Sequence, residues 1–569
     1  MTALAPVAAA PVAASWPLPD LTVTDPTPAG TFTVTDAPDA PSVWLLEVVQ
    51  PAGGVFAPAP FGLVAGLPVA AFGLPPDLAD AAPPVGRFSD RGWVGEPDDA
   101  DAPNVAFPPR LVEPPAIVRR APIYPDEERR AVVSAGELVL ANGDGALDAL
   151  AGNARLGGRA VTLSRGPRRR PRHAPRAAFS RFGVMRITDV LAEDGGRLRV
   201  GLGGAELDLG GDACGTYGGT GGADGHAGLK GTAIPWLFGI RRNIEPVLED
   251  RALEIHRVSA RGVAEILGVR SKGVPLTPTG DVANRAALAA LSLGTGTYAT
   301  CAAEGIFRRS GPVDDVITCD ARGDAPGGYV GSAGDIAARL LSLVGGVPAA
   351  SLGAFAWPAG EVGICLREGT VAEAVSALAA GVGGYWGADA FGVFGGGTIL
   401  PPETAPVAFV IEPWMLSGAP TEAGGSRPVR WRSRVNYRPN GRVMAAGDLA
   451  GAVSDADRAV WGRASEPGSP NGDVGRRGLY PLAEDPDPVE SLFDALADAD
   501  ALGLRLDALL GVPRGAWSLP LGRWVPEALV PGAVGIVRWP GLAALAGGRR
   551  VVVREAAVDG DAAELEVWG

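Results

Sequence analysis

Glycine and proline interrupt this sequence at such short intervals that few segments can continue as a long helix or strand. The chain has 82 glycines and 52 prolines among 569 residues, and both residue types are disfavoured inside regular elements. Between them lie short apolar runs, such as SVWLLEVVQ at 42–50, which suit buried strands. We find no fixed-period repeat, collagen-like or otherwise. The spacing favours many short strands joined by turns.

The overall composition predicts a folded chain and excludes several functional classes. Hydrophobic residues make up 47% and charged residues 20%, so a core can form. The formal net charge of −14 argues against a general nucleic-acid binder. Three histidines leave little material for histidine-based catalysis. The four cysteines are too scattered for a disulfide scaffold; they are Cys214, Cys301, Cys319 and Cys365.

The N-terminal part of the chain has a distinct composition. Residues 1–40 are rich in Ala, Pro and Thr and predict an extended arm, without the basic start and continuous apolar helix of a signal peptide. Residues 52–75 are apolar, but prolines interrupt any membrane-spanning helix there. The many prolines and aspartates of 51–125 predict a long irregular excursion, a feature that often carries assembly surfaces. We expect a soluble chain with no secretion signal of its own.

Hairpins and a few helices are predicted further along. Residues 182–204 alternate and turn at Asp194-Gly195-Gly196, and the last 20 residues predict a hairpin turning at Asp559-Gly560. Helices are expected at 332–345, where Ser332 is a possible cap and Gly345 an end, and at 369–384. Two more helical candidates are 448–461 and 489–503. The predicted fold class is mainly β with a few helices (α+β), in several domains.

The glycine-dense loop 215–231 contains GTGGADGHAGLKG. A phosphate loop needs GxxxxGK followed by Ser or Thr, after a strand and before a helix. Here the spacing from Gly225 to Lys230 is wrong, and Pro235 follows where a helix would have to begin. We therefore interpret the segment as a tight loop at an interface, with no nucleotide.

Metal-binding chemistry is weakly represented. Asn142, Asp144 and Asp148 resemble part of a calcium loop, but the further oxygen ligands and the Glu at the twelfth position are missing. No CxxC pair exists, and His226 and His256 are not at ligand spacing. Buried free cysteines and solvated turn carboxylates are the favoured interpretation. We assign no catalytic, cofactor-binding or metal-ligating residue.

The basic run SRGPRRRPRHAPR at 164–176 is the strongest local charge feature. It could contact DNA or acidic groups of a partner. Aromatic residues do not interleave it, as a nucleic-acid stacking platform would require. We favour a solvated loop between two strands, or a protein–protein salt-bridge surface.

Five stretches resemble, in the same order, segments of one protein family. They are FPPRLVEPPAIVRR (107–120) with GELVLANGDGALDAL (136–150), YGGTGGADGHAGLKGTAIPWLFGIRRNIEPVLED (217–250), GTYATCAAEGIFRRSGP (296–312) with TCDARGD after it, RVNYRPNGRVMAAGDLAGAVSDADRAVWGRA (434–464), and PGAVGIVRWPGLAALAGGRRVVVREAAVDGDAAELEVWG (531–569). The family is that of the tail-tip (baseplate) hub proteins of long-tailed phages and prophages, related to the trimeric central hub of contractile-tail baseplates. The ordered matches run from about residue 42 to Gly569 and cover most of the chain.

The sequence departs from the family pattern in three places. The family's Asn-Trp pair is Asn440-Gly441 here. The arginines at 168–172 and the arm at 1–40 have no counterpart that we can match. The resemblance implies a division into an arm at 1–40, a first tube-type β-barrel at 41–215 with the excursion 51–125, an inserted β-rich domain at 216–330, a second tube-type domain with helices at 331–480, and a C-terminal segment at 481–569 that completes a β-barrel.

The resemblance also implies a non-enzymatic role in the virion. Family hubs form homotrimers in which two barrels per subunit imitate the six-fold tail tube, and they close or gate its distal end. The expected partners are the distal tail protein, the tape measure protein and a central fibre or spike, with genomic DNA only passing through and the host envelope contacted indirectly. Such a subunit is made in the host cytoplasm and ends in the tail tip.

Two alternatives remain open from the sequence. A receptor- or carbohydrate-binding tail protein would need a solvent-facing aromatic cluster, for which Tyr385-Trp386 is a scattered candidate. A tail-associated cell-wall hydrolase would need a placed nucleophile or a carboxylate pair. No cysteine lies in a recognisable nucleophile context, and spacing along the sequence does not identify a carboxylate pair among 64 acidic residues.

Overall fold

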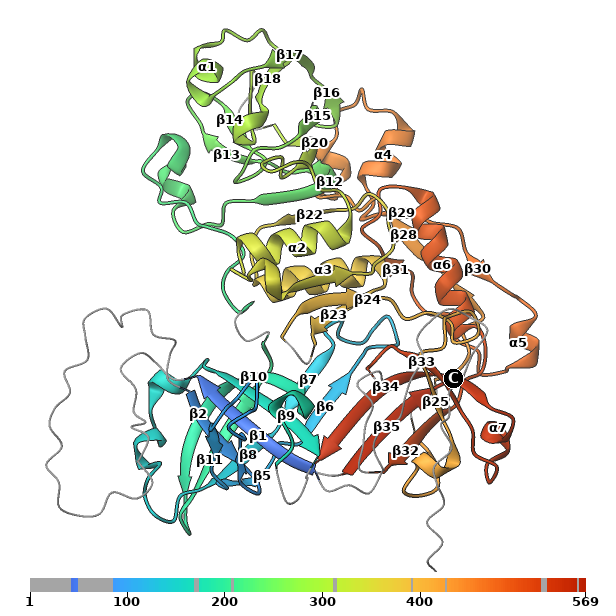
Figure 1. The fold of residues 1–569 in the computed structure, drawn as a ribbon. Helices are drawn as coiled ribbons and strands as arrows, with labels where there is room; N and C mark the ends of the chain where they lie inside the picture. Colours follow the sequence, from blue (N-terminus) through green and yellow to red (C-terminus); the bar gives the residue numbers. More distant parts are fainter. Residues whose placement is uncertain are drawn as a thin grey trace, which may run out of the picture.

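The computed structural model describes residues 42–49, 85–167, 173–205, 209–310, 315–389, 392–424, 427–522, 530–559 and 562–569. In these residues the chain is mainly β with a few helices and forms several bodies, as the fold class predicted. The arm 1–40, residues 51–84 of the excursion and the arginines at 168–172 lie outside the described residues. Figure 1 shows two β-sheets side by side at one end of the molecule and a third β body at the other.

The N-terminal sheet has seven strands in the order β2-β1-β9-β10-β11-β8-β5. They are β1 (Ser42–Val49), β2 (Val85–Ser89), β5 (Leu111–Glu113), β8 (Glu137–Ala141), β9 (Ala160–Pro167), β10 (Ser180–Glu193) and β11 (Arg197–Gly203), with a separate pair β3 (Trp93–Val94) and β4 (Ala106–Phe107). Alternate side chains point inward, so Leu138, Leu163 and Met185 are fully buried in one cluster. The hairpin predicted at Asp194-Gly195-Gly196 is confirmed, because Glu193 pairs with Arg197.

The C-terminal sheet has eight strands, of which six follow the order β25-β33-β34-β35-β32-β26. They are β25 (Phe409–Ile411), β26 (Thr421–Glu422), β32 (Ala516–Leu521), β33 (Val534–Val537), β34 (Arg549–Asp559) and β35 (Ala562–Trp568), with helix α7 (Ala543–Ala546) beside them. The other two strands are β6 (Ile117–Arg120) and β7 (Val132–Ala135). The closing hairpin is confirmed, since Asp559 pairs with Ala562; the two residues between them lie outside the described residues.

The two sheets contain the same four-strand motif. In the N-terminal motif, β8, β9, β10 and β11 follow one another in the chain and are ordered β9-β10-β11-β8 in the sheet. In the C-terminal motif, β32, β33, β34 and β35 are ordered β33-β34-β35-β32. All neighbouring strands in both motifs are antiparallel. The motif is therefore used twice in one chain.

The likeness extends to irregularities of the backbone. The long hairpin strand of each motif carries a β-bulge, between Ile187 and Asp189 in β10 and between Val553 and Glu555 in β34. The residue just before each bulge makes two backbone hydrogen bonds: its N–H donates to a neighbouring carbonyl, and its own carbonyl accepts from the N–H of a glycine with positive φ. Ile187 N donates to Arg159 O and Gly158 N to Ile187 O (3.0 and 2.8 Å); Val553 N donates to Ala533 O and Gly532 N to Val553 O (2.9 and 2.7 Å). Gly158 and Gly532 have φ of 76° and 88°, a conformation suited to glycine.

A strand from the N-terminal part joins the two motifs. β6 pairs antiparallel with β34, from Ile117 opposite Val558 to Arg120 opposite Glu555, and with β7 on its other side. Part of the predicted excursion 51–125 is thus a strand of the C-terminal sheet.

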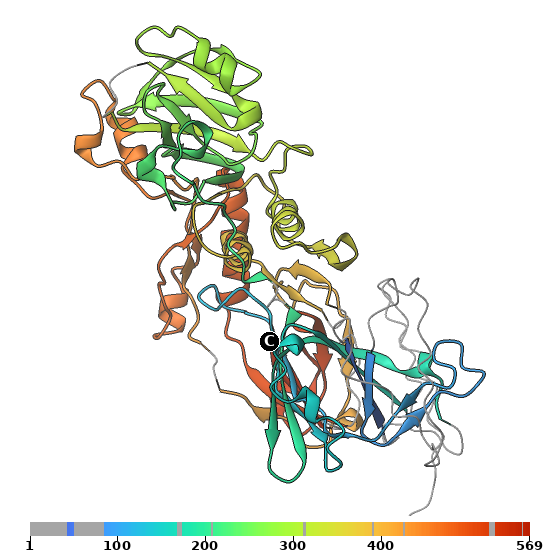
Figure 2. The same ribbon diagram turned by 90° about the vertical axis from the view of Figure 1, so that its left-hand side faces the viewer.

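A third β body contains two five-stranded sheets packed around one core (Figure 2, green). Its elements are β12 (Trp236–Ile244), β13 (Val247–Asp250), β14 (Ile255–Arg257), β15 (Glu265–Ser271), β16 (Val274–Pro275), β17 (Thr277–Asp281), α1 (Arg285–Ala290), β18 (Thr297–Cys301), β19 (Ile306–Arg309), β20 (Ile317–Gly323) and β22 (Gly363–Leu366). Leu237, Phe307 and Cys319 are fully buried in this core.

The remaining helices and short strands lie between the third body and the two motifs or beside the third body (Figure 1). They are α2 (Ala333–Leu343), β21 (Leu352–Phe355), α3 (Val371–Val382), β23 (Tyr385–Ala388), β24 (Phe394–Gly397), β27 (Arg432–Ser433), β28 (Val435–Tyr437), α4 (Asp455–Trp461), β29 (Glu466–Pro467), β30 (Asn471–Gly472), α5 (Arg476–Leu479), β31 (Val489–Glu490) and α6 (Leu496–Leu510).

The helices expected at 332–345 and 369–384 are confirmed. Ser332 caps α2 by accepting from Asp335 N, and Thr370 forms a capping box with Glu373 at the start of α3. The other two begin later than predicted: α4 at Asp455 and α6 at Leu496. Val489 and Glu490 pair with β28 instead of joining a helix, because strand pairing competes for their backbone groups.

Candidate functional site

Arg554, the residue at the bulge of β34, lies at the junction between the C-terminal sheet and the chain that connects β6 to β7. Its guanidinium contacts Glu127 at 3.1 Å and Glu566 at 2.7 Å, and its carbonyl accepts from Ala121 N at 2.9 Å. Glu127 also accepts from Ile123 N and Tyr124 N, at 2.7 and 3.1 Å. Since the Arg554 side chain is only 12% exposed, these charge-assisted bonds fix the chain that leaves β6 against the C-terminal sheet.

Aromatic side chains extend this junction. Arg427 lies over the Tyr124 ring at 4.1 Å and contacts the Asp126 carboxylate at 2.6 Å. Tyr124 meets Trp568 edge to face at 6.2 Å, and Trp568 is buried. A cation over a ring and an edge-to-face aromatic pair each stabilise such a contact modestly. The last strand of the chain is thereby packed against the segment that follows β6.

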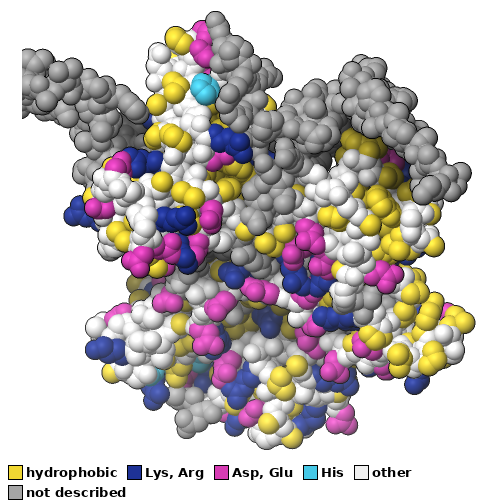
Figure 3. Space-filling model, turned by 90° about the horizontal axis from the view of Figure 1, so that it is seen from below, with side chains coloured by type: hydrophobic (Ala, Val, Ile, Leu, Met, Phe, Trp, Pro, Cys, Tyr) yellow, Lys and Arg dark blue, Asp and Glu magenta, His cyan; other side chains and the backbone are white. Residues whose placement is uncertain are grey.

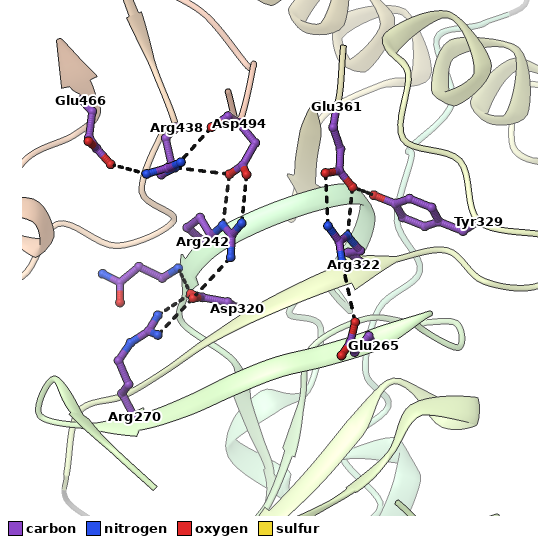
Figure 4. A network of polar contacts seen from close by, with 11 residues as sticks. Arg242, Glu265, Arg270, Asp320, Arg322, Tyr329, Glu361, Arg438, Glu466 and Asp494 are labelled. Carbon is purple, nitrogen blue, oxygen red and sulfur yellow. Dashed lines mark hydrogen bonds and ion pairs between the residues drawn. The ribbon is translucent and has the colours of Figure 1, made fainter. Parts of the chain in front are cut away.

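A second polar network connects the third β body to the segment 435–494 (Figure 4). Arg242 of β12 forms two hydrogen bonds to Asp494, at 3.0 and 2.9 Å, and lies 3.9 Å from Asp320 of β20. Arg438 contacts Asp494 at 3.6 Å and Glu466 at 3.0 Å. The network spans residues more than 250 positions apart and joins the two parts through hydrogen bonds and ion pairs.

A separate set of polar contacts lies at the edge of the third body (Figure 4). Arg322 forms hydrogen bonds of 2.9 and 3.3 Å to Glu361, which also accepts from the Tyr329 hydroxyl at 2.7 Å. Burial opposes the charged form of Glu361, yet Arg322 and Tyr329 hold the pKa of this carboxyl below its ordinary value. The Glu361 carboxylate is thus fully engaged by neighbours within the chain and joins Tyr329 to Arg322 of β20.

At Asn440-Gly441, where the family that the sequence resembles has Asn-Trp, backbone atoms pack closely around the glycine. Gly441 N donates to Arg242 O at 2.9 Å, and a Cβ here would lie 2.9 Å from the Cα of Ile244. A tryptophan does not fit against this backbone. Asn440 keeps a structural role, because its amide donates to Val460 O and Arg463 O at 2.8 and 2.7 Å.

The glycine loop 215–231 is folded around Asp224. The Asp224 carboxylate accepts from the Thr220 hydroxyl at 2.6 Å and from Gly218 N at 2.8 Å, and these bonds lower its pKa. His226 Nδ1 accepts from Gly228 N at 3.1 Å. Two short 3-10 turns occupy the loop and strand β12 follows. The loop's own carboxylate takes the backbone N–H groups that a phosphate would need.

The calcium-like turn at 142–148 is also internally satisfied. Arg110 forms hydrogen bonds of 2.9 and 2.6 Å to Asp144, and this guanidinium holds the pKa of Asp144 well below its ordinary range. Asn142 donates to Asp148 at 2.7 Å and accepts from Leu147 N at 2.7 Å. An arginine stands where a cation would bind.

The cysteines and buried histidine show no reactive geometry. All four cysteines are free, and burial raises the pKa of Cys214 to about 11. His256 stacks on Phe307 at 5.0 Å, and burial followed by the nearby Arg309 lowers its pKa to about 3. In the part of the chain that the structure describes, no group of three or more His, Cys, Asp or Glu residues could hold a metal ion.

The described ends of the arginine run contact the protein itself. Arg165 lies 5.3 Å from the Trp44 ring, and Arg176 contacts Glu47 at 3.2 Å. The aromatic pair Tyr385-Trp386 is likewise internal, since Trp386 is fully buried and its indole N–H donates to Ser376. Tyr385 donates to Pro531 O at 3.4 Å. It therefore forms no solvent-facing aromatic groove.

Seen from the end that carries the two motifs, acidic and basic side chains are interspersed rather than separated into fields of one sign (Figure 3). Within the described ranges, no helix is both long and apolar enough to cross a bilayer.

The junction residues were not identified from the sequence. Arg554 and Glu127 lie 427 positions apart, and neither belongs to a motif with a fixed spacing. The local signal is a short strand followed by a turn at 117–127, and this pattern does not indicate that Glu127 contacts Arg554.

No protein-family model matches the sequence, and no curated protein matches it. Similar solved structures include the 43 kDa tail protein of prophage MuSo2 from Shewanella oneidensis, the tail protein from Neisseria meningitidis and a prophage tail protein from Listeria monocytogenes. Their sequence identities are 10%, 9% and 7%, and their TM-scores are 0.34, 0.36 and 0.29. Each alignment covers 80% of this chain and 92%, 92% and 94% of the other chain.

Proposed function

We propose that this protein is a structural subunit of a phage-type tail and acts as a trimeric hub at the tail tip. The observation that carries the proposal is the four-strand motif present twice in one chain, with the same strand order and the same bulge position. It agrees with the ordered resemblance of the sequence to tail-tip hubs. Each motif is proposed as the sheet of one tube-type barrel.

The duplication suits a ring of mixed symmetry. Three copies of a chain with two related motifs supply six similar units, so a three-fold ring can match a six-fold tube. A ring of this kind closes through heterologous contacts between neighbouring copies. Within the chain, the Arg242 and Arg438 contacts would hold the third body against the segment 435–494, and Arg554 would hold the connection from β6 to β7 against the C-terminal sheet.

The role is proposed to be non-enzymatic. The polar residues that the sequence singled out, in the glycine loop, the 142–148 turn and the described ends of the arginine run, are engaged by other groups of the same chain. Such engagement supports a structural use of these side chains over a reactive one. The buried position of Trp386 likewise gives no support to the receptor-binding alternative.

The proposed partners follow from the hub role. We infer contacts with the distal tail protein and the tape measure above and with a central fibre or spike below, in the assembled tail tip of the virion. The net charge of −14 suits a channel through which DNA slides without sticking. A charge map of the assembled ring with a neutral or basic lumen would contradict this part of the proposal.

Mass measurement in solution and tail-tip reconstruction test the proposal together. We expect a trimer of the 57.8 kDa chain, centred on the tail axis, with its six motifs arranged as a ring. A monomer located away from the axis would refute the hub. A peptidoglycan zymogram with the same preparation is expected to stay dark, and a clearing zone would favour the hydrolase alternative.

A further inference from the structure

The two motifs differ in what covers the hairpin strand beyond the bulge. In the C-terminal motif, β34 pairs with β35 on one side, and on the other side β33 covers its first part and β6 covers Glu555–Val558. The covering strand comes from the N-terminal part of the chain. The second half of β34 is therefore paired on both sides.

The equivalent edge of β10 is open in the described structure. β9 pairs with β10 from Ser180 to Arg186, and Ile187 bonds to the residues just before β9. From Val190 to Glu193, the described residues supply one backbone hydrogen bond on this side, from Gly152 N to Val190 O at 3.0 Å. Leu191 is 54% exposed on this stretch. An open edge with exposed apolar side chains is a template for strand addition.

We propose that the β10 edge at 191–193, beyond the Gly152 contact, accepts a strand from a second copy of this chain. This inference rests on the proposed ring. Inside the chain, the N-terminal motif donates β6 to the C-terminal motif. Between copies, the C-terminal motif of one subunit donates the corresponding strand to the N-terminal motif of the next, and the same contact recurs around the ring.

The corresponding donor begins at β26. Leu416 pairs with Leu521 of β32 in an isolated β-bridge. Leu111 makes the equivalent pair in the N-terminal motif, with Leu140 of β8. Further along, Ala423 N donates to Ala516 O at 2.9 Å, at the position where Ile117 of β6 pairs with Ala135. β26 is the last strand at its end of the C-terminal sheet. Residues 421–424 are thus the counterpart of the start of the strand that covers β34.

The arrangement alternates donor and acceptor in one direction. In each copy, the acceptor edge of β34 is covered by β6 of the same chain, and the acceptor edge of β10 is open in the described structure. Likewise, the donor β6 is already paired, and the donor that begins at β26 is free to pair with the next copy. Such a contact is heterologous, so it continues from copy to copy until the ring closes. The number of copies, three, is that of the proposed hub.

A proline at Ala192 tests the acceptor edge. Val190 O bonds outward to Gly152, and residues alternate along a strand, so the Ala192 N–H also points outward, away from β11. Ala192→Pro removes this N–H donor, which makes no hydrogen bond to β11. Proline is tolerated at such outward-facing positions of an edge strand. The control Ala192→Thr keeps the N–H. We expect light scattering to give monomers for the proline variant and trimers for the threonine variant.

Cross-linking tests the identity of the two strands. The double variant Ala192→Cys with Ala423→Cys is oxidised, and the two single variants control for the native cysteines. We expect covalent dimers and trimers for the double variant alone. Cross-links confined to single chains would overturn the inference.

The outcomes separate the two proposals. A trimer that survives Ala192→Pro and gives no cross-link refutes strand addition at β10 and leaves the hub standing. A wild-type chain that stays monomeric at every concentration refutes both. If hydrogen exchange finds the Ala192 amide protected in such a monomer, a segment of the same chain occupies the edge and strand addition between copies is excluded.

Discussion

The N-terminal and C-terminal motifs share their strand order, register and bulge, but they differ at the bulge residue itself. Thr188 of β10 is exposed and the adjacent Asp189 bonds within its own hairpin, accepting from Gly201 N at 3.1 Å. Arg554 of β34 instead contacts Glu127 and Glu566. The common part is maintained by backbone pairing and apolar packing, whereas the difference lies in what each hairpin is attached to.

The largest expected effect is in the core that the motifs share. Leu138 of β8 and Leu519 of β32 lie at equivalent positions, opposite Val200 and Leu565, and both are fully buried. Leu138→Ala and Leu519→Ala should each lower the free energy of unfolding by about 2–5 kcal/mol through lost transfer energy and a cavity. Denaturant unfolding measures this loss.

Hydrogen exchange locates the damage caused by these variants. Leu519→Ala should increase exchange in β35 and β6, which belong to one sheet, while Leu138→Ala should act first on β11. The exposed Leu191 is the control, and Leu191→Ala should change stability by less than about 0.5 kcal/mol. If Leu138→Ala costs far less than Leu519→Ala, the two cores are not equivalent.

The next effect tests the difference at the bulge. Arg554→Ala removes hydrogen bonds to two carboxylates at a site that is 12% exposed, and it should cost about 1–3 kcal/mol. Thr188→Ala is the matched control and should stay within about 0.5 kcal/mol. Thermal unfolding of both variants checks the pair, and equal shifts would contradict the assigned role of Arg554.

A smaller effect is expected at the glycines before the bulges. Gly158→Ala should cost about 1–2 kcal/mol, because an alanine is strained at positive φ. Gly532→Ala should cost more, since its Cβ would also meet the Tyr385 hydroxyl, whereas no atom lies within 4 Å at Gly158. Unfolding midpoints rank the two, and the reverse order would show that the sites are not equivalent.

The smallest effect at neutral pH concerns His256, which lies outside both motifs. Its pKa is lowered from 6.5 to about 3 in the folded chain, so below pH 6.5 the unfolded state binds the proton more readily. Lowering the pH from about 6.5 to about 3 should therefore lower the free energy of unfolding, by up to about 1.4 kcal/mol per pH unit.

Exchange measurements across this pH range locate the acid effect. We expect the third β body to loosen on acidification before the two motifs do. In His256→Phe this part of the pH dependence should disappear. If β11 and β35 open first in the wild-type chain, the acid sensitivity belongs to the motifs instead.

Local features were predictable wherever a few neighbouring residues decide the structure. The hairpins after Glu193 and after Asp559 follow from turn residues between alternating strands. The starts of α2 and α3 follow from Ser332 and Thr370, whose side chains accept the free backbone N–H groups of the first turn. Short strands between glycines and prolines account for the mainly β class.

Long-range pairing was not predictable in the same way. The helical pattern at 489–503 did not reveal that Val489 and Glu490 pair with β28. Arg242 and Asp494 lie 252 positions apart, and the residues around Arg242 do not indicate which carboxylate it contacts. The repeated motif is hidden as well, because the two copies are matched by backbone hydrogen bonds that many different side chains allow.

The short strands, their turns and the helix caps follow from neighbouring residues alone, because they depend on the φ preferences and hydrogen-bonding groups of those residues. Only the tertiary structure decided that 117–120 joins the C-terminal sheet, that one motif occurs twice, and that β34 is covered where β10 is open. Those features depend on which distant edges meet. Backbone edges are chemically alike, so packing of the whole chain selects the partner.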